Sequence, residues 1–271
     1  MEFLRSFLSL LSAKMEEPKS YGWFHLMFVA IMIGLTVFLC LKFKNSSDKA
    51  LRIIAFICWG VMVTLEIYKQ FEYSYNLGET SITWDYQWYA FPYQLCSTPL
   101  YVLPFIFLMK DSKVRDAFLA YMSTFSMFGG LATFIYPEQV FISTIGINIQ
   151  TMVHHGLQIV LGIFFIVWAR KKINRWYFIK AVPVFAVLVT IAILANNAFM
   201  SLGIDETFNM FYISPHFDCT LPILSMIYPK VNYLIFVALY ILGFTLIAFI
   251  IFLIARGIIG LTRRKKKKSA C

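Results

Sequence analysis

The chain has 271 residues, of which 60% are hydrophobic, 18% aromatic and only 14% charged. This composition is too apolar for a water-soluble domain and is typical of a protein that crosses a membrane several times. The net charge of +10 does not indicate nucleic-acid binding, because the basic residues lie at the ends of apolar runs and no soluble basic module remains outside them. The five cysteines have no CxxC spacing, so the sequence predicts neither a disulfide framework nor a zinc knuckle.

Residues 1–20 form an amphipathic segment ahead of the first apolar run. Phe3, Leu4, Phe7 and Leu8 recur at helical spacing with polar residues between them. This pattern predicts a short helix that lies in the membrane interface. The segment lacks the basic start and the small-residue cleavage site of a signal peptide, so we expect it to remain attached.

Seven apolar runs follow, and each has the length of about 20 residues that a helix needs to cross a bilayer. The runs are Tyr21–Phe43, Lys49–Tyr73, Trp88–Met109, Val114–Tyr136, Gln150–Ala169, Tyr177–Leu202 and Val231–Ala255. The sequence therefore predicts an all-α polytopic membrane protein. Its seven transmembrane helices occupy residues 21–256, and a basic cytoplasmic tail occupies residues 257–271.

Basic residues are concentrated in alternate loops. Of the 24 Lys and Arg residues, 19 lie in or at the edges of the loops that join the first and second, third and fourth, and fifth and sixth runs, or from Arg256 onward. The positive-inside rule places these segments in the cytoplasm. We therefore expect a multi-pass protein of the plasma membrane with its N-terminus outside and its C-terminus inside. The closing Arg263–Lys268 run would anchor the last helix beside anionic lipid headgroups.

Polar residues within the apolar runs gather in the outer half of the predicted bundle. They are His25, Glu66, Cys96, His154, His155, Asn196 and Asn197. Such groups are costly in lipid unless they are paired or hydrated, so their asymmetry predicts one shared polar cavity that opens outward. For Glu66 or His25 taken singly, solvation at the interface is an equally good explanation.

Cys96 lies in a proline-rich part of the third run. Pro99 cannot donate a backbone hydrogen bond to the Leu95 carbonyl, so we expect a kink beside Cys96. If the regular helix restarts near Pro92, the positive helix N-terminus would favour a nucleophilic thiolate at Cys96. The alternative is an inert buried cysteine that only fills space.

A polar stripe on the fifth run supplies the candidate base. Gln150, His154 and Gln158 are four residues apart and therefore share one helix face, whereas His155 points about 100° away. His154 is the predicted general base for a nucleophilic cysteine, with His155 second. We expect Glu66 or an asparagine to orient the imidazole.

Two further roles remain open at this stage. Gln94, Asn197 or backbone N–H groups near Pro92 are candidate donors to an oxyanion. A metal site built from histidines and Cys96 would have suitable ligand types, but adjacent helical residues such as His154 and His155 do not face one point. We therefore expect neither a metal nor a cofactor.

Short motifs across most of the chain resemble those of a known family. The Phe91–Cys96 stretch is similar to the Leu-Pro-Leu-His-Leu-Cys element of YwaF-type bacterial integral membrane proteins, although it has Phe91 and Gln94 where that family often has Leu and His. Other positions also resemble the family, namely His25 within Trp23–Leu26, Glu66, His154–His155, Asn197 and the Asn209–Pro215 stretch. The related eukaryotic proteins of the transmembrane protein 164 type are acyltransferases that remodel ether phospholipids with a cysteine and a histidine. By resemblance, these are Cys96 and His154.

The combined prediction is a membrane-embedded acyltransferase or acyl hydrolase that acts on phospholipid or lysophospholipid through a Cys-His thioester mechanism. The predicted catalytic residues are Cys96 and His154, and the supporting residues are His155, Glu66, Gln94, His25, Asn197 and Asn209. The alternative is a non-enzymatic transporter of small solutes or a ligand sensor that uses the same cavity. The sequence shows no repeat between its halves and no matched broken helices of the kind that many transporters have.

Overall fold

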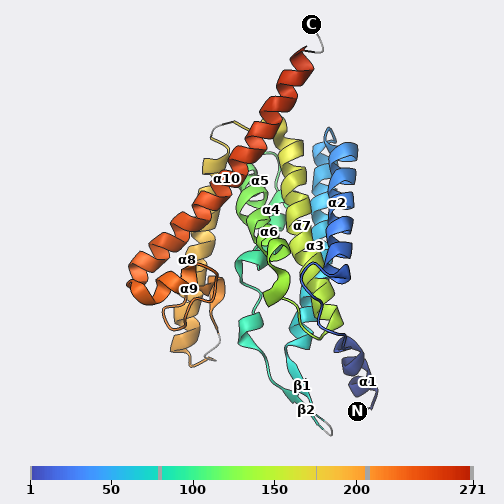
Figure 1. The fold of residues 1–271 in the computed structure, drawn as a ribbon, viewed down its shortest axis with the longest axis vertical. Helices are drawn as coiled ribbons and strands as arrows, with labels where there is room; N and C mark the ends of the chain where they lie inside the picture. The colour runs from blue at the N-terminus through green and yellow to red at the C-terminus, as the bar shows by residue number, and fades with distance from the viewer. Residues whose placement is uncertain (1, 79–80, 175, 205–207, 269–271) are drawn as a thin grey trace.

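The computed structural model describes residues 2–78, 81–174, 176–204 and 208–268, with only the backbone described for residues 262–268. It is an all-α polytopic membrane protein (Figure 1). In the described part of the chain, six helical segments are long and apolar enough to cross a membrane. They are α2 (Trp23–Phe43), α3 (Asp48–Glu72), the segment formed by α5 (Lys113–Tyr121) and α6 (Met127–Ile135), α7 (Ile145–Trp168), α8 (Ala181–Ser201) and α10 (Tyr233–Lys268).

Smaller elements complete the described chain. They are α1 (Glu2–Leu11), the antiparallel strands β1 (Tyr75–Leu77) and β2 (Ile82–Trp84), α4 (Pro99–Leu108) and α9 (Leu224–Ile227). Several 3-10 turns and one π-helical stretch, Met122–Ser126, lie between them. Two spanning segments begin at serine caps, where Ser47 Oγ accepts the Ala50 N–H and Ser112 Oγ accepts the Arg115 N–H.

The third predicted span differs from the continuous helix that the sequence indicated. Residues 88–98 form two separate 3-10 turns, Trp88–Ala90 and Leu95–Ser97, and the α-helix α4 begins only at Pro99. The expected restart of the helix at Pro92 is therefore wrong. Proline fits the first turn of a helix, where its missing N–H is not needed, so Pro99 starts α4.

Other donors replace the backbone hydrogen bond that Pro99 cannot donate to the Leu95 carbonyl. The Leu95 carbonyl accepts the backbone N–H of Thr98 at 3.3 Å and the Thr98 hydroxyl at 2.7 Å. This local pairing closes the turn that contains Cys96. The backbone can therefore stay irregular here without an unpaired carbonyl in the membrane.

Despite this break, the chain returns from one end of the bundle to the other between the end of α3 and the start of α5 (Figure 1). At one end, Arg115 pairs with Asp48, and Lys172 pairs with Asp111 at 2.7 Å, which brings three of the predicted cytoplasmic loops together. The β1–β2 hairpin and α1 lie at the other end, and the two termini lie at opposite ends (Figure 1). Arg175 and residues 269–271 belong to the segments predicted to be cytoplasmic, and they lie outside the described residues.

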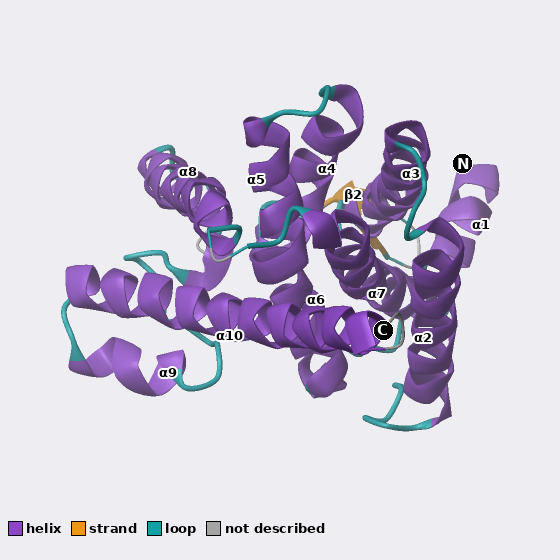
Figure 2. Ribbon diagram, turned by 90° about the horizontal axis from the view of Figure 1, so that it is seen from above, coloured by secondary structure: helices purple, strands orange, loops and turns teal. Residues whose placement is uncertain are grey.

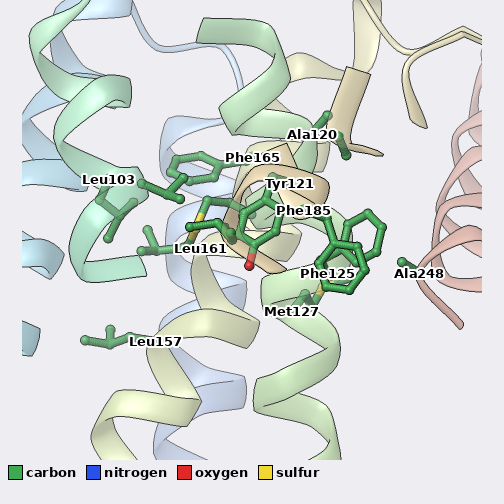
Figure 3. Packing of buried hydrophobic residues seen from close by; sticks show 14 of the residues in the cluster. Leu103, Ala120, Tyr121, Phe125, Met127, Leu157, Leu161, Phe165, Phe185 and Ala248 are labelled. Atoms are coloured by element: carbon green, nitrogen blue, oxygen red, sulfur yellow. The ribbon is translucent and has the colours of Figure 1, made fainter. Parts of the chain in front are cut away.

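The helix α7 lies at the centre of the bundle. In its most apolar 18-residue window 67% of the residues are buried, compared with 22% in α10, and α10 crosses the outside of the bundle (Figure 2). Side chains from several helices meet around the fully buried Tyr121 and Phe125 (Figure 3). The rings of Phe125 and Phe185 stack with centroids 4.3 Å apart.

The helix α1 is tied to the protein rather than free in the interface. The Leu11 carbonyl accepts the Tyr68 hydroxyl at 2.8 Å, and the Ser12 hydroxyl donates to Glu72 at 2.8 Å. Leu8 is buried, whereas Phe3 is 85% exposed. One side of α1 therefore packs on the bundle, and its other apolar side chains are free to contact lipid.

Candidate active site

Cys96 and His154 come together through the backbone of the cysteine. His154 Nε2 lies 2.9 Å from the Cys96 carbonyl oxygen, and the Gln158 side-chain amide donates to the same oxygen at 2.7 Å. Both side chains are buried and come from α7, one turn apart. The polar stripe predicted on this helix therefore fixes the turn that carries the thiol.

This contact determines the form of the imidazole. A carbonyl oxygen can only accept, so Nε2 of His154 carries the hydrogen and donates it. In the neutral ring, the lone pair is then on Nδ1. This nitrogen is buried and has no hydrogen-bond partner among the described residues.

Close helix packing allows this arrangement. A Cβ atom placed on Gly130 would lie 2.5 Å from the His155 carbonyl oxygen, and one on Gly129 would lie 3.2 Å from Gln158 Oε1 and 3.9 Å from the Cys96 Cα. Two successive glycines thus let α6 approach both α7 and the cysteine turn. Small residues of this kind are what allow membrane helices to pack closely.

Glu66 belongs to a second polar group, on α3. Its Oε1 accepts Lys69 Nζ at 2.9 Å and Gln70 Nε2 at 2.7 Å. Gln70 in turn accepts the Tyr86 hydroxyl at 2.7 Å. Burial, with a smaller contribution from the Glu66 charge, raises the pKa of Tyr86 to about 12, so this hydroxyl keeps its proton and acts as a donor.

The group around Glu66 lies near Cys96 but makes no described hydrogen bond to His154. Glu66 and Lys69 are close enough for their charges to act on the Cys96 thiol. The expected orientation of the imidazole by Glu66 is therefore not what the described contacts provide. The contacts that hold the His154 ring in the described chain come from the Cys96 carbonyl instead.

Gln94 binds a loop rather than facing a reacting group. Its amide nitrogen donates to the Asn209 carbonyl at 3.0 Å, and its amide oxygen accepts the Phe211 N–H at 2.7 Å. Asn209 itself accepts the Ser214 N–H at 2.9 Å. Both ends of the Gln94 amide are thus occupied, so an oxyanion would need another donor.

The loop that Gln94 holds has an unusual backbone. Phe211 and Tyr212 have φ of 59° and 56°, a left-handed conformation that non-glycine residues rarely adopt. Asn196 stabilises it from α8, because its amide accepts the Met210 N–H at 2.7 Å and donates to the Met210 carbonyl at 3.0 Å. Burial raises the pKa of Tyr212.

Three other predicted residues lie apart from the cysteine turn. His155 bonds through Nδ1 to the Thr151 carbonyl at 2.8 Å on its own helix. His25 is fully buried between aromatic rings, including those of Phe134 and Phe141. Asn197 is exposed on α8 and donates to the carbonyl one turn back, at 2.8 Å.

The sequence missed the roles of two residues. Gln158 was placed on the polar stripe but not at Cys96. Asn197 was predicted as a supporting residue, whereas it is the buried Asn196 that binds the Met210 backbone. Helix phase separates the two asparagines by about 100°.

Cys96 and Cys219 are free thiols, so no disulfide removes the candidate nucleophile. The described part of the chain contains no group of three or more His, Cys, Asp or Glu side chains placed to hold a metal ion.

The fold and this site define a polytopic α-helical membrane protein with a cysteine and a histidine brought together inside the bundle. Comparison with known families agrees with this class. Residues 20–256 match the profile of the TMEM164 family, so the chain belongs to that family. The match confirms the resemblance to transmembrane protein 164 proteins and is compatible with the YwaF-type motifs. No curated protein and no solved structure matches the chain.

Proposed function

We propose that this protein is a membrane-embedded acyltransferase, or acyl hydrolase, of the plasma membrane that acts on phospholipid acyl chains through Cys96. The observation that carries the proposal is the convergence of His154 and Gln158 on the Cys96 carbonyl, at 2.9 and 2.7 Å. These two contacts hold the backbone of the cysteine turn against a buried imidazole, in a segment whose helix is interrupted. Membership of the TMEM164 family supports it as well.

The proposed reaction has two steps. In the first, the Cys96 sulfur forms a bond to the acyl carbonyl carbon of a phospholipid, the ester C–O bond breaks, and the departing lysolipid oxygen takes the thiol proton. In the second, the oxygen of an acceptor hydroxyl or of water attacks the thioester. The C–S bond then breaks, and the proton of the attacking group returns to the cysteine sulfur.

His154 transfers the proton in both steps. Because Nε2 donates to the Cys96 carbonyl, Nδ1 is the nitrogen left to accept and return the proton. It has no hydrogen-bond partner among the described residues, so in this proposal it reaches the thiol only when substrate is bound. Gln94 has both ends of its amide bound to the 209–211 backbone, so in this proposal it positions the loop beside Cys96. Backbone N–H groups of the irregular segment are left as donors to the oxyanion.

A search for the thioester tests this proposal. Purified wild-type protein, given a phospholipid with a labelled acyl chain, should carry the label on the Cys96 peptide as a bond that neutral hydroxylamine cleaves. Cys58→Ala is the matched control, because Cys58 is a buried cysteine of α3 outside the cysteine turn, and it should keep the label. Cys96→Ala should lose both the label and lipid turnover while remaining folded.

The opposite result would also be clear. A folded Cys96→Ala protein that remodels phospholipids at the parent rate would exclude the thioester mechanism. Ligand binding or solute transport would then be the better assignment for the same region of the bundle.

A further inference from the structure

Residues 208–214, which lie between α8 and α9, have a backbone conformation that their side chains do not favour. Phe211 and Tyr212 are both left-handed, with φ of 59° and 56°. A left-handed position is usually occupied by glycine, as it is just after α8 at Gly203, which has φ of 66°. Two consecutive aromatic residues in this conformation are strained, because each Cβ atom lies close to the following carbonyl oxygen.

The 208–214 segment is tied to the cysteine turn through Gln94. Gln94 directly precedes the Leu95–Ser97 turn, which contains Cys96. Its amide nitrogen donates to the Asn209 carbonyl at 3.0 Å, and its amide oxygen accepts the Phe211 N–H at 2.7 Å. The position of the strained backbone and the position of the thiol are therefore coupled.

Two membrane helices hold the other side of the segment. Asn196 of α8 accepts the Met210 N–H at 2.7 Å and donates to the Met210 carbonyl at 3.0 Å. At the start of α10, the Tyr233 hydroxyl donates to the Ile213 carbonyl at 3.0 Å. Strained backbone persists only where the surrounding structure imposes it, and it is concentrated in switch regions and ligand clamps. Loss of one of these contacts would therefore let the segment relax.

We propose that residues 208–214 form a gate that controls access to the Cys96 thiol. With the segment in its present position, Cys96 is only partly exposed. Gln94 and Asn196 hold the gate closed, and the strain in its backbone favours opening. The gate adds a means of regulation to the site of the proposed function and rests on that function only for what Cys96 does. Access to the thiol can be measured without any acyl chemistry.

The test measures how fast N-ethylmaleimide alkylates Cys96 in the full chain. The protein is held in dodecyl maltoside micelles, which contain no acyl ester that could occupy the thiol. Peptide mass spectrometry follows Cys96 and Cys58 in the same sample, because Cys58 is buried on α3 and reports any general loosening. Where a group is reached mainly through an opening, its reaction rate is proportional to the population of the open state.

A matched pair of substitutions at Tyr212 tests the strain. Tyr212→Asn and Tyr212→Val both remove the ring, but asparagine tolerates the left-handed conformation and β-branched valine does not. Cys96 should react about tenfold faster in Tyr212→Val than in Tyr212→Asn, the size of the steric penalty at one residue. If Tyr212→Val does not fold, Cys96 should still react more slowly in Tyr212→Asn than in the wild type. Equal rates would overturn the role of strain.

Adjacent asparagines on α8 test the contacts that hold the gate. Asn196→Ala removes both hydrogen bonds to Met210 and should speed alkylation of Cys96 about tenfold, with the rate at Cys58 unchanged. Asn197→Ala is the matched control and should change neither rate, because Asn197 is exposed and binds its own helix. An unchanged rate at Cys96 in Asn196→Ala, or an equal rise at Cys96 and Cys58, would overturn the gate.

These rates also distinguish the gate from the proposed function. If they respond as expected but no acyl thioester forms on the wild-type protein, the gate stands and guards a site of another kind. If the thioester forms but the alkylation of Cys96 responds neither to Asn196→Ala nor to the pair at Tyr212, the gate fails by itself.

Discussion

His154 Nε2 and the Cys96 backbone carbonyl oxygen are 2.9 Å apart, and the Gln158 amide binds the same oxygen at 2.7 Å. A carbonyl oxygen has two lone pairs, and here both are used by side chains from successive turns of α7. The position of the candidate nucleophile is therefore set by the helix that carries the candidate base.

This relationship predicts different effects for two substitutions. Gln158→Ala removes only a contact to the backbone and should lower the free energy of unfolding by about 1–3 kcal/mol, with a modest loss of turnover. His154→Ala removes both the contact and the base, so it should reduce lipid turnover by about 10²–10⁴-fold. Turnover by reconstituted variants and thermal unfolding together measure both effects.

His155→Ala serves as the control, because His155 bonds to the Thr151 carbonyl on its own helix. It should act on stability and leave turnover largely unchanged. If Gln158→Ala and His154→Ala reduced turnover equally at equal stability, His154 would have only the positioning role.

Gly130 should tolerate no side chain. A Cβ atom there would lie 2.5 Å from the His155 carbonyl oxygen, and backbone cannot move aside as a flexible side chain can. Gly130→Ala should therefore lower the free energy of unfolding by about 1–3 kcal/mol through overpacking. Gly34→Ala is the matched control in a membrane helix, because nothing lies within 4 Å of its Cβ position, and it should not destabilise. Thermal unfolding measures both, and equal stabilities would show that α6 and α7 do not pack this closely.

Stability should fall in acid partly through Asp111. The hydrogen bond from Lys172 at 2.7 Å, with the nearby positive charges, holds the pKa of Asp111 below its ordinary value of 3.8. A carboxylate whose pKa is lower in the folded than in the unfolded chain stabilises the fold above the unfolded pKa. This contribution is lost as the pH falls through the folded pKa. Melting temperatures of wild-type and Asp111→Asn protein should therefore differ near neutral pH and converge below about pH 4.

The effect should be small, because the Asp111 side chain is 60% exposed and water screens the pair. Lys172→Met provides the control. In that background, Asp111→Asn should change the melting temperature less than it does in the wild type. A full-sized effect without Lys172 would assign the stabilisation to another partner.

The orientation in the membrane follows from the basic residues. The positive-inside rule predicts that the end holding Lys113 is cytoplasmic and that the hairpin end is outside. In intact cells, an added cysteine at Thr83 should react with a membrane-impermeant thiol reagent, and one at Lys113 should react only after permeabilisation. Both positions are exposed in the folded protein. The reverse pattern would invert the orientation and place the candidate active site nearer the inner surface.

The sequence by itself determined the class of this protein and the helix that holds its site. Apolar runs of spanning length and the alternate basic loops need only composition and periodicity, so they predicted the all-α polytopic fold and the opposite ends of the termini. The four-residue spacing of Gln150, His154 and Gln158 depends only on helix geometry, and all three side chains are buried as that spacing implied.

Only the tertiary structure decided what those side chains contact. Helix periodicity cannot show that His154 binds a backbone carbonyl of another segment, or that α4 begins at Pro99 rather than near Pro92. It also could not distinguish inward Asn196 from exposed Asn197, because the facing side of a helix depends on its neighbours. Spacing within one helix is local, whereas the meeting of α7 with the cysteine turn depends on how closely separate helices pack, and the successive glycines at 129 and 130 set that distance.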